Sequence, residues 1–191
     1  MRIVGGRHRG RRLAAPRGRE IRPTSDRARQ ALFNLLAHGP YGGPEGPMPA
    51  GRAVLDVFAG SGALGLEALS RGAAHVHFIE HDVEALRLIR RNAGSFAGEA
   101  EITVGRLDAT RPGPPPRSYD LVLIDPPYRS GLAGPALRAL SQAGWLGPDA
   151  VVVVELGKAE SFEAPEDFEL VDQRRYGAAR LFILRRRAAV G

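Results

Sequence analysis

The sequence contains no cysteine and only one lysine among its 191 residues. Without cysteine the chain cannot form a disulfide, bind zinc through thiolates or use a cysteine nucleophile. Methylation of nucleic acid at a pyrimidine carbon, which ordinarily proceeds through a covalent thiolate, is excluded for the same reason. The chemistry that remains relies on carboxylates, backbone groups and bound cofactors.

Long hydrophobic runs are lacking too. No stretch approaches the roughly 20 apolar residues that a membrane-spanning helix needs, and no apolar segment of signal-peptide length follows the basic N-terminus. We therefore expect a cytoplasmic protein without membrane association. A length of 191 residues suffices for one domain with its own core, and we expect a monomer.

Positive charge is concentrated at the N-terminus. Residues 1–30 contain ten arginines and two acidic residues, a local excess of +8, whereas the whole chain carries +6, so the remainder carries −2. Arginines neutralise phosphates and release counterions, which makes a polyanion the expected partner of this segment. A solvated basic arm without a partner is the alternative.

Residues 1–51 are predicted to form an N-terminal extension, and residues 52–191 the main domain. The segment "MRIVGGRHRGRRL" predicts a short β-hairpin whose arginines face solvent or RNA. Ser25 and Asp26 are typical of a helix start. The apolar side of that helix consists of Ala28, Ala31, Leu32, Leu35 and Leu36. Residues 38–51 contain four prolines and five glycines, which predicts a linker.

From residue 52 onward, strand-like and helix-like segments alternate. Strands are expected at 53–58, 75–80, 101–106, 119–125 and 150–156, and helices at 61–72, 82–94 and 131–143, with a proline-rich loop at 111–118. Such alternation indicates a parallel sheet covered by helices on both faces. The last two segments, 168–177 and 179–186, are too close for a crossover helix and predict an antiparallel hairpin. The fold class is therefore α/β, with a Rossmann-like, mostly parallel seven-stranded sheet.

A glycine-rich turn follows the first predicted strand. Gly60, Gly62 and Gly65 have the G-x-G-x-x-G spacing of dinucleotide-binding folds, and Glu80 ends the second strand twenty residues after Gly60. By itself this pattern favours an NAD enzyme. Asp56 opposes that interpretation, because a carboxylate beside the loop disfavours a bound pyrophosphate.

S-adenosylmethionine has the opposite requirements, since it carries a cationic amino-acid end, a ribose with two hydroxyls and no phosphate. We expect Asp56 to face its ammonium, Glu80 to accept from its ribose hydroxyls and Asp108 to accept from its adenine amino group. Each acid could instead cap a helix. The predicted cofactor-binding residues are Asp56, Phe58, Ala59, Gly60, Ser61, Gly62, Glu80, His81, Asp108 and Ala109. His81 would contribute through its backbone, and no metal is expected.

The segment "LIDPPY" ends the fourth predicted strand. An aromatic exocyclic amine that accepts a methyl group is a poor nucleophile, so an enzyme must orient it. Asp125 and the carbonyl of Pro126 offer acceptors for the two N–H groups of such an amine. Pro126 and Pro127 hold these acceptors rigidly and contribute no competing N–H. Tyr128 can stack on an extruded base. Asp125, Pro126, Pro127 and Tyr128 are therefore the predicted catalytic residues.

The segments "VLDVFAGSGALGLEALSRGA", "FIEHD" and "LIDPPY" resemble the class I S-adenosylmethionine-dependent amino-methyltransferases. With "MRIVGGRHRGRRL" and "RPTSDRARQALFNLL", most of the chain resembles the bacterial RsmD family, which methylates N2 of guanine 966 in 16S rRNA. The proline-rich loop at 111–118 departs from the family, in which a helix is usual there.

The resemblance implies that five residues lie over the cofactor cleft and help hold the substrate: Arg22, Pro23, Thr24, Arg27 and Arg29. It also implies that the acceptor is an assembled or partly assembled 30S particle. The predicted RNA contacts are Arg7, Arg9, Arg11, Arg12, Arg22, Thr24, Arg27, Arg29 and Arg129. Two other functions stay open. An adenine-N6 DNA methyltransferase shares the D/N-P-P-Y motif, although residues 1–51 leave little room for a target-recognition domain. A non-catalytic RNA-binding protein could also retain the fold.

The remaining polar candidates are expected to be structural. His75 and His77 form an H-x-H pair, a pattern that can bind metal, but no third ligand is suggested. Trp145 is expected to pack in the core, and Glu155 to form a cap or a salt bridge, with a catalytic role as its alternative. The residues expected in loops are His8 and His38.

Overall fold

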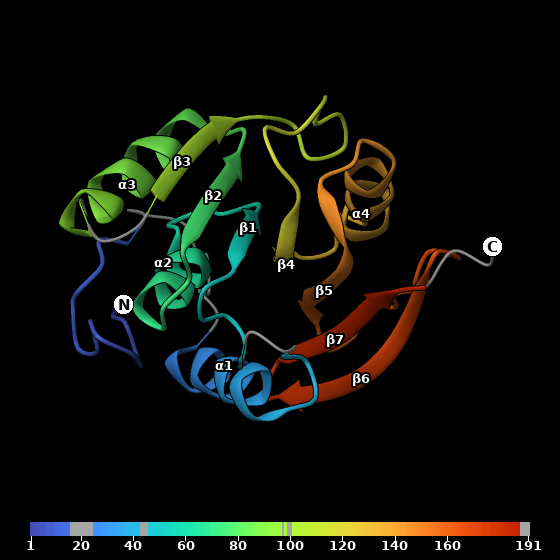
Figure 1. The fold of residues 1–191 in the computed structure, drawn as a ribbon, viewed down its shortest axis with the longest axis horizontal. Helices are drawn as coiled ribbons and strands as arrows, with labels where there is room; N and C mark the ends of the chain where they lie inside the picture. The colour runs from blue at the N-terminus through green and yellow to red at the C-terminus, as the bar shows by residue number, and fades with distance from the viewer. Residues whose placement is uncertain (16–24, 43–45, 97, 99–100, 188–191) are drawn as a thin grey trace.

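The computed structural model describes residues 1–15, 25–42, 46–96, 98 and 101–187. Seven strands form one sheet in the order β3-β2-β1-β4-β5-β7-β6 (Figure 1). The strands are β1 (Ala53–Val57), β2 (His75–Glu80), β3 (Glu101–Arg106), β4 (Tyr119–Ile124), β5 (Leu146–Gly157), β6 (Phe168–Tyr176) and β7 (Ala179–Arg186). The helices are α1 (Asp26–His38), α2 (Ala63–Ser70), α3 (Val83–Ala93), α4 (Ala133–Gln142) and the 3-10 turn η1 (Gly94–Phe96).

The sheet is parallel from β3 to β5, and β7 runs antiparallel to both β5 and β6. This topology confirms the predicted α/β class and the C-terminal hairpin. The chain builds outward from β1 through β2 to β3, then returns to β1's other edge with β4. The strand order therefore reverses between β1 and β4, which is where open α/β sheets bind ligands.

The sheet separates two hydrophobic clusters. One contains residues of α1, α2 and α3, and the other contains α4 with Trp145 and Phe168. Burial of each large apolar side chain contributes about 1.5–3 kcal/mol, so both helical layers hold the sheet in place. Trp145, 1% exposed, packs in the core as predicted.

The N-terminal extension shares its core with the sheet. Ile3, Leu13 and Phe33 belong to the same cluster as β1 and α2. Between residues 1 and 15 the backbone forms one isolated bridge, Arg2 to Arg12, so the predicted hairpin is shorter than a two-stranded ribbon. The described part of the extension and the sheet thus bury their apolar residues in one core. The domain boundary at residue 51 stays a prediction.

Three local predictions need correction. The linker expected at 38–51 is anchored, since Tyr41 and Met48 are each 5% exposed in the main core. His38 is the last residue of α1 rather than part of a loop. The strand expected to reach Phe58 stops at Val57, because Phe58 has a φ of 61° and so leaves the β region.

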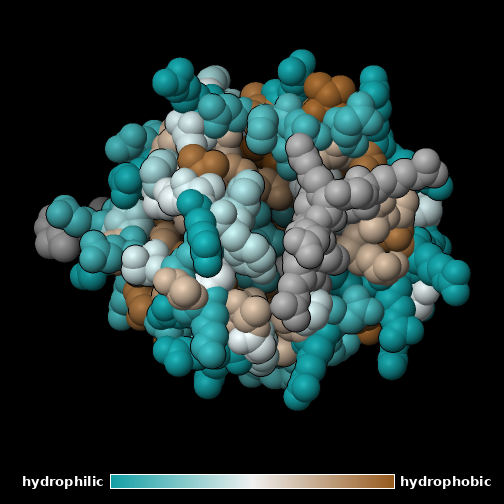
Figure 2. Space-filling view, turned by 180° about the vertical axis from the view of Figure 1, so that it is seen from behind, coloured by the Kyte–Doolittle hydropathy of each residue, from teal (hydrophilic) through white to brown (hydrophobic). Residues whose placement is uncertain are grey.

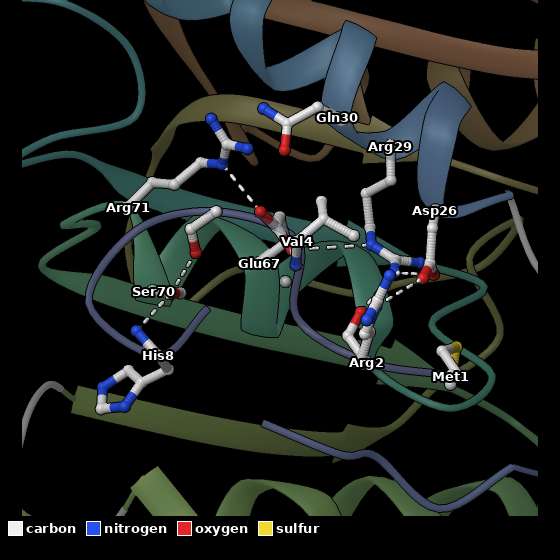
Figure 3. A network of polar contacts seen from close by, with 12 residues as sticks. Met1, Arg2, Val4, His8, Asp26, Arg29, Gln30, Glu67, Ser70 and Arg71 are labelled. Atoms are coloured by element: carbon white, nitrogen blue, oxygen red, sulfur yellow. Dashed lines mark hydrogen bonds and ion pairs between the residues drawn. The ribbon is translucent and has the colours of Figure 1, made fainter. Parts of the chain in front are cut away.

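A buried carboxylate joins the extension to the sheet-covering helices (Figure 3). Glu67 of α2 has no exposed side-chain area and accepts from the Val4 backbone N–H at 2.8 Å. Arg71 Nε donates to the other oxygen of Glu67, Oε1, at 2.8 Å. Arg29 Nε lies 3.6 Å from Glu67 Oε2. Arg29 also pairs with Asp26 at 2.8 Å. One acid thus holds the N-terminal segment, α1 and α2 in register.

Replacing Glu67 with alanine should lower the free energy of unfolding by about 3–5 kcal/mol, because the buried Arg29 Nε would lose the carboxylate beside it and the Val4 N–H would lose its acceptor. Denaturant titration would measure the loss as a lower midpoint at unchanged slope.

Glu84→Ala is the matched control, since Glu84 pairs with Arg87 on the exposed side of α3. Such surface pairs contribute about 0–1 kcal/mol. Equal losses in the two variants would contradict the role given to Glu67.

Candidate active site

The strand pairing lines up four residues at the carboxyl edge of the sheet. They follow the last in-register pairs between β2 and β1, between β1 and β4, and between β4 and β5. In sheet order they are Glu80, Phe58, Asp125 and Glu155. Neighbouring strands lie about 4.8 Å apart. Asp125 therefore stands one strand from Glu155 and two strands from Glu80.

The backbone turns sharply after β1. Phe58, Gly60 and Gly62 have φ values of 61°, 54° and 78°. A positive φ is costly for an aromatic residue and is typical of functional sites. Gly65 is required for a different reason: a Cβ there would lie 2.4 Å from the Phe78 ring, so α2 could not pack on β2. Gly60 and Gly62 thus allow the backbone to turn, and Gly65 allows α2 to pack closely on β2.

Glu80 connects this loop to β2. Its Oε2 accepts from Gly60 N at 2.9 Å, and its Oε1 accepts from His81 N and Asp82 N at 2.8 and 3.0 Å. Oε1 also lies 3.2 Å from His81 Nδ1, so Oε2, which accepts from Gly60 N, is the oxygen with room for a further donor. The predicted contact with ribose hydroxyls stays a prediction, as does the backbone contact of His81.

Asp56 lies inside β1 rather than at its end, and is 1% exposed. Its Oδ2 accepts from Gly65 N in the first turn of α2 at 2.8 Å. Burial raises the pKa of Asp56 well above its ordinary value, and the charges of Asp125 and Glu80 raise it further, while the Gly65 bond opposes them. Glu80 and Asp125 give this edge a negative potential, to which Asp56 adds at a pH above its raised pKa, and this potential favours a cationic ligand over a pyrophosphate. The predicted ammonium contact itself stays a prediction.

Asp108 is exposed and bonds to its own turn. It accepts from the backbone N and the Oγ1 of Thr110 at 2.8 and 2.7 Å, and these bonds lower its pKa. Ala109 beside it is 3% exposed. The adenine contact predicted for this pair stays a prediction. The proline-rich loop that follows is anchored by Trp145, whose Nε1 donates to Gly113 O at 2.8 Å.

The D-P-P-Y segment leaves the sheet beside the glycine loop. Asp125 N donates to Val57 O at 3.3 Å, so Asp125 lies beside the last residue of β1. Asp125 is half-buried and Pro126 buried, whereas Pro127 is exposed and Tyr128 is 47% exposed. The segment therefore begins at a residue fixed to β1 and ends with an exposed aromatic side chain.

The turn after Tyr128 is fixed by an acid that the sequence reasoning missed. Arg129 has a φ of 58°, and its N–H donates to Glu160 Oε2 at 2.8 Å. Glu160 Oε1 accepts from Gly157 N at 2.9 Å, which ties the turn to the end of β5. The sequence shows only an acid just after a strand, which is too common a pattern to single it out.

A cleft of about 300 Å³ opens beside Tyr128. It lies between the start of α1, the D-P-P-Y segment, β5 and the turn from β6 to β7. Its lining residues are Ser25, Arg27, Ala28, Tyr128, Glu155, Arg175, Tyr176, Gly177, Ala178 and Ala179. Sequence reasoning had treated Glu155 as structural first and had not considered the hairpin turn at 175–178. Asp125 is not among these lining residues, and it stands one strand from Glu155, on the side toward β1.

The arginines predicted to contact RNA differ in exposure. Arg7, Arg9 and Arg12 are exposed, as are Arg27 and Arg129. Hydrophilic side chains extend around most of the outline of the face in Figure 2, with hydrophobic ones in separate patches. The five exposed guanidinium groups are accessible to a polyanion from solvent.

One of these predictions is wrong, and another concerns a half-buried side chain. Arg29 has no exposed side-chain area, so its predicted contact with RNA is wrong: the guanidinium is enclosed by Asp26 and Glu67. Arg11 is half-buried over the Phe96 ring, 4.7 Å from its centroid, and donates to Ser95 O. Arg22, Pro23 and Thr24 lie outside the described residues.

The H-x-H pair lies in the core. His77 Nδ1 is 2.5 Å from Tyr119 Oη, and its ring packs against Trp145. His75 Nδ1 is 3.0 Å from Glu101. Among the described residues, no group of three or more His, Asp or Glu side chains is placed to hold a metal ion, and no helix there could span a membrane.

Comparison with known proteins agrees with the resemblance over nearly the whole chain. The family model "Conserved hypothetical protein 95" matches residues 1–185. Ribosomal RNA small subunit methyltransferase D of Escherichia coli K12 is 40% identical over 158 residues, which cover 81% of this chain and 74% of that protein. Its Haemophilus influenzae counterpart is 34% identical over 181 residues, covering 93% and 89%. The solved structure of yhhF from Escherichia coli has a TM-score of 0.79 at 35% identity, covering 98% of each chain.

Asp56→Asn should change the pH dependence of stability. Because the pKa of Asp56 is raised in the folded state, the folded protein holds this proton more tightly than the unfolded chain. Wild-type stability should therefore fall as the pH rises from about 4 toward the raised pKa. Asparagine cannot ionise but can still accept from Gly65 N, so the variant should gain stability relative to wild type over that range.

Denaturant titrations at several pH values would measure this difference. Calorimetry with S-adenosylmethionine should show weaker binding by the same variant, because the negative potential is reduced. Parallel pH profiles for the two proteins would contradict the assignment, and unchanged affinity would remove Asp56 from the cofactor site.

Proposed function

We propose that this chain, which belongs to the RsmD family of methyltransferases, transfers a methyl group from S-adenosylmethionine to the exocyclic N2 of a guanine in 16S rRNA. The relatives named as rRNA methyltransferases support the substrate class. The observation that carries the proposal is the position of Asp125, one strand from the glycine loop and beside the cleft that Tyr128 lines.

The cofactor would be held by the loop at 58–62 and by Glu80. The turned backbone allows close approach, and Glu80 retains capacity for a hydroxyl donor. When bound, S-adenosylmethionine supplies an electrophilic methyl on a sulfonium. The acids Asp56, Glu80 and Asp125 give this edge the negative potential that such a cation favours.

Asp125 and the Pro126 carbonyl would accept the two N–H groups of the guanine amine. This orients the nitrogen lone pair toward the methyl and removes competing hydrogen bonds. Tyr128, 47% exposed, can stack on the extruded base. The methylated nitrogen is strongly acidic and loses its proton to Asp125 or to water, so the reaction needs no histidine base.

Arg7, Arg9 and Arg12 would bind rRNA phosphates, with Arg27 and Arg129 nearer the cleft. The family resemblance extends the proposal to guanine 966 and to 30S particles as the acceptor. We also propose that the protein acts as a cytoplasmic monomer that needs no metal. Adenine-N6 methylation of DNA would use the same acceptor pair, so the acceptor must be tested directly.

Incubation with labelled S-adenosylmethionine and unmethylated 30S particles should yield label in N2-methylguanosine, identified by nucleoside analysis. Asp125→Ala should lower kcat by about 100-fold or more, because one of the two orienting acceptors is lost. Affinity for rRNA should persist, and S-adenosylmethionine should still bind, though more weakly than to wild type because one charge of this edge is lost.

Asp149→Ala is the matched control, since Asp149 is an exposed acid on β5, away from this edge, and should leave the rate unchanged. Label in another nucleoside would refute guanine N2 as the acceptor. Label in duplex DNA at N6-methyladenine would support the DNA alternative, and full activity of Asp125→Ala would refute the catalytic assignment.

Combined Arg7→Ala, Arg9→Ala and Arg12→Ala substitutions should weaken binding to 30S particles and flatten its salt dependence. Each lost phosphate contact should reduce the slope of log K against log salt by about 0.7–0.9. Arg138→Ala on the exposed side of α4 is the control and should leave the slope unchanged. An unchanged slope in the triple variant would exclude these arginines from the RNA interface.

A further inference from the structure

Glu155 is a buried carboxylate that the proposed reaction does not use. It is 2% exposed and lines the cleft beside Tyr128. The pairing of β4 with β5 sets it directly beside Asp125, one position beyond the pair Ile124 and Val154. Within β5 it lies on the same face as Val153, which packs in the cluster that contains α1. Two acids thus stand side by side where an acceptor base would enter.

The cleft has the size and composition of a nucleotide site. Its volume of about 300 Å³ lies at the lower end of the range for small-molecule pockets. Arg27 and Arg175 line it and are exposed, whereas Glu155 is buried and Tyr128 offers an aromatic face. A phosphate fits the exposed arginines and is repelled by the buried acid. A donor-rich base edge fits the acid, so the ligand would enter base first.

Guanine and adenine differ at the atom next to the amine. Guanine presents an N1–H donor beside its amino group, while adenine presents an N1 lone pair beside its own. If Asp125 and the Pro126 carbonyl accept the two amine hydrogens, N1–H is left without an acceptor. A buried unpaired donor costs about 1–3 kcal/mol, so the site needs a third acceptor close to Asp125.

We propose that Glu155 accepts the N1–H of the target guanine and thereby selects guanine over bases with a lone pair at N1. This inference rests on the proposed function and adds the residue that sets its base specificity. Glu155 has an interaction partner in this structure. Because a carboxylate has about four lone-pair sites, it can accept a further donor without losing that partner. A base with a lone pair at N1 would face the carboxylate's own lone pairs and be rejected.

The test uses two acceptors that carry the same 2-amino group. One is 16S rRNA with guanine at the target position, and the other is ligated rRNA with 2,6-diaminopurine there, which has a lone pair at N1. Both would be assembled into 30S particles and methylated under single-turnover conditions. Wild type should prefer guanine by about 10- to 100-fold in kcat/KM, the discrimination expected of a good specific contact.

Glu155→Gln should reduce this preference at least tenfold, because its amide can donate to the diaminopurine N1 as readily as it accepts from guanine. Glu169→Gln is the matched control: Glu169 is an exposed acid on β6, and the variant should keep the wild-type preference. Calorimetry should find the S-adenosylmethionine affinity of Glu155→Gln unchanged, since Glu155 lies on the acceptor side of Asp125.

Two outcomes would overturn the inference. In the first, wild type methylates diaminopurine and guanine with equal efficiency, a result that requires only the wild-type enzyme. Alternatively, Glu155→Gln could lose rate equally on both acceptors and keep the wild-type ratio, which would make Glu155 structural. Failure of the proposed function is a separate result, namely no N2 label in guanine-containing particles with wild-type enzyme.

Discussion

The hydrogen-bonded pairing of β1 with β4 is the constraint on which the site depends. It places Asp125 N within 3.3 Å of Val57 O, at the point where β1 turns into the glycine loop. Residues nearly seventy positions apart in the chain thereby share one edge of the sheet. A one-residue slip of β4 would move its side chains to the opposite face. Such a slip would put Asp120 or Asp125 in the place of a buried apolar residue of β4, and the cost of burying that carboxylate opposes it.

The buried acids of this protein have two kinds of function at once. Asp56 accepts from the α2 backbone, Glu80 from the glycine loop and Glu67 from the N-terminal segment. Each bond stabilises local structure, and each also fixes where a negative charge lies. In the sequence alone, a structural role and a ligand-binding role look like alternatives for each of these acids. Backbone donors satisfy only part of a carboxylate's capacity, so the same acid can hold a loop and still bind a ligand.

Much of the fold could be predicted from the sequence because its signals are local. Alternating apolar segments and the short final connection predicted a mostly parallel seven-stranded sheet with a C-terminal antiparallel hairpin, which the structure confirms. Arg29 could not be predicted correctly, because its burial depends on Glu67, 38 positions away and on another helix. Glu155 was undervalued for the same reason: its neighbour Asp125 is set by strand register, and the cleft by the β6–β7 turn. The periodicity of apolar residues predicts which side of a helix or strand is buried. It does not predict which distant residue packs against that side.

Charge is divided between the surface and the interior in a way that suits a cationic cofactor and a polyanionic acceptor. The first 30 residues carry an excess of +8, and Arg7, Arg9 and Arg12 are exposed, whereas Asp56, Glu80 and Glu155 are each less than a tenth exposed. Solvent and salt screen the arginines, so they act mainly on attraction and orientation of a large anion. The acids lie in a less polar setting, where a charge acts strongly on neighbouring groups. An RNA backbone would therefore be held at the rim and kept out of the acidic edge, while a neutral base could pass between the two.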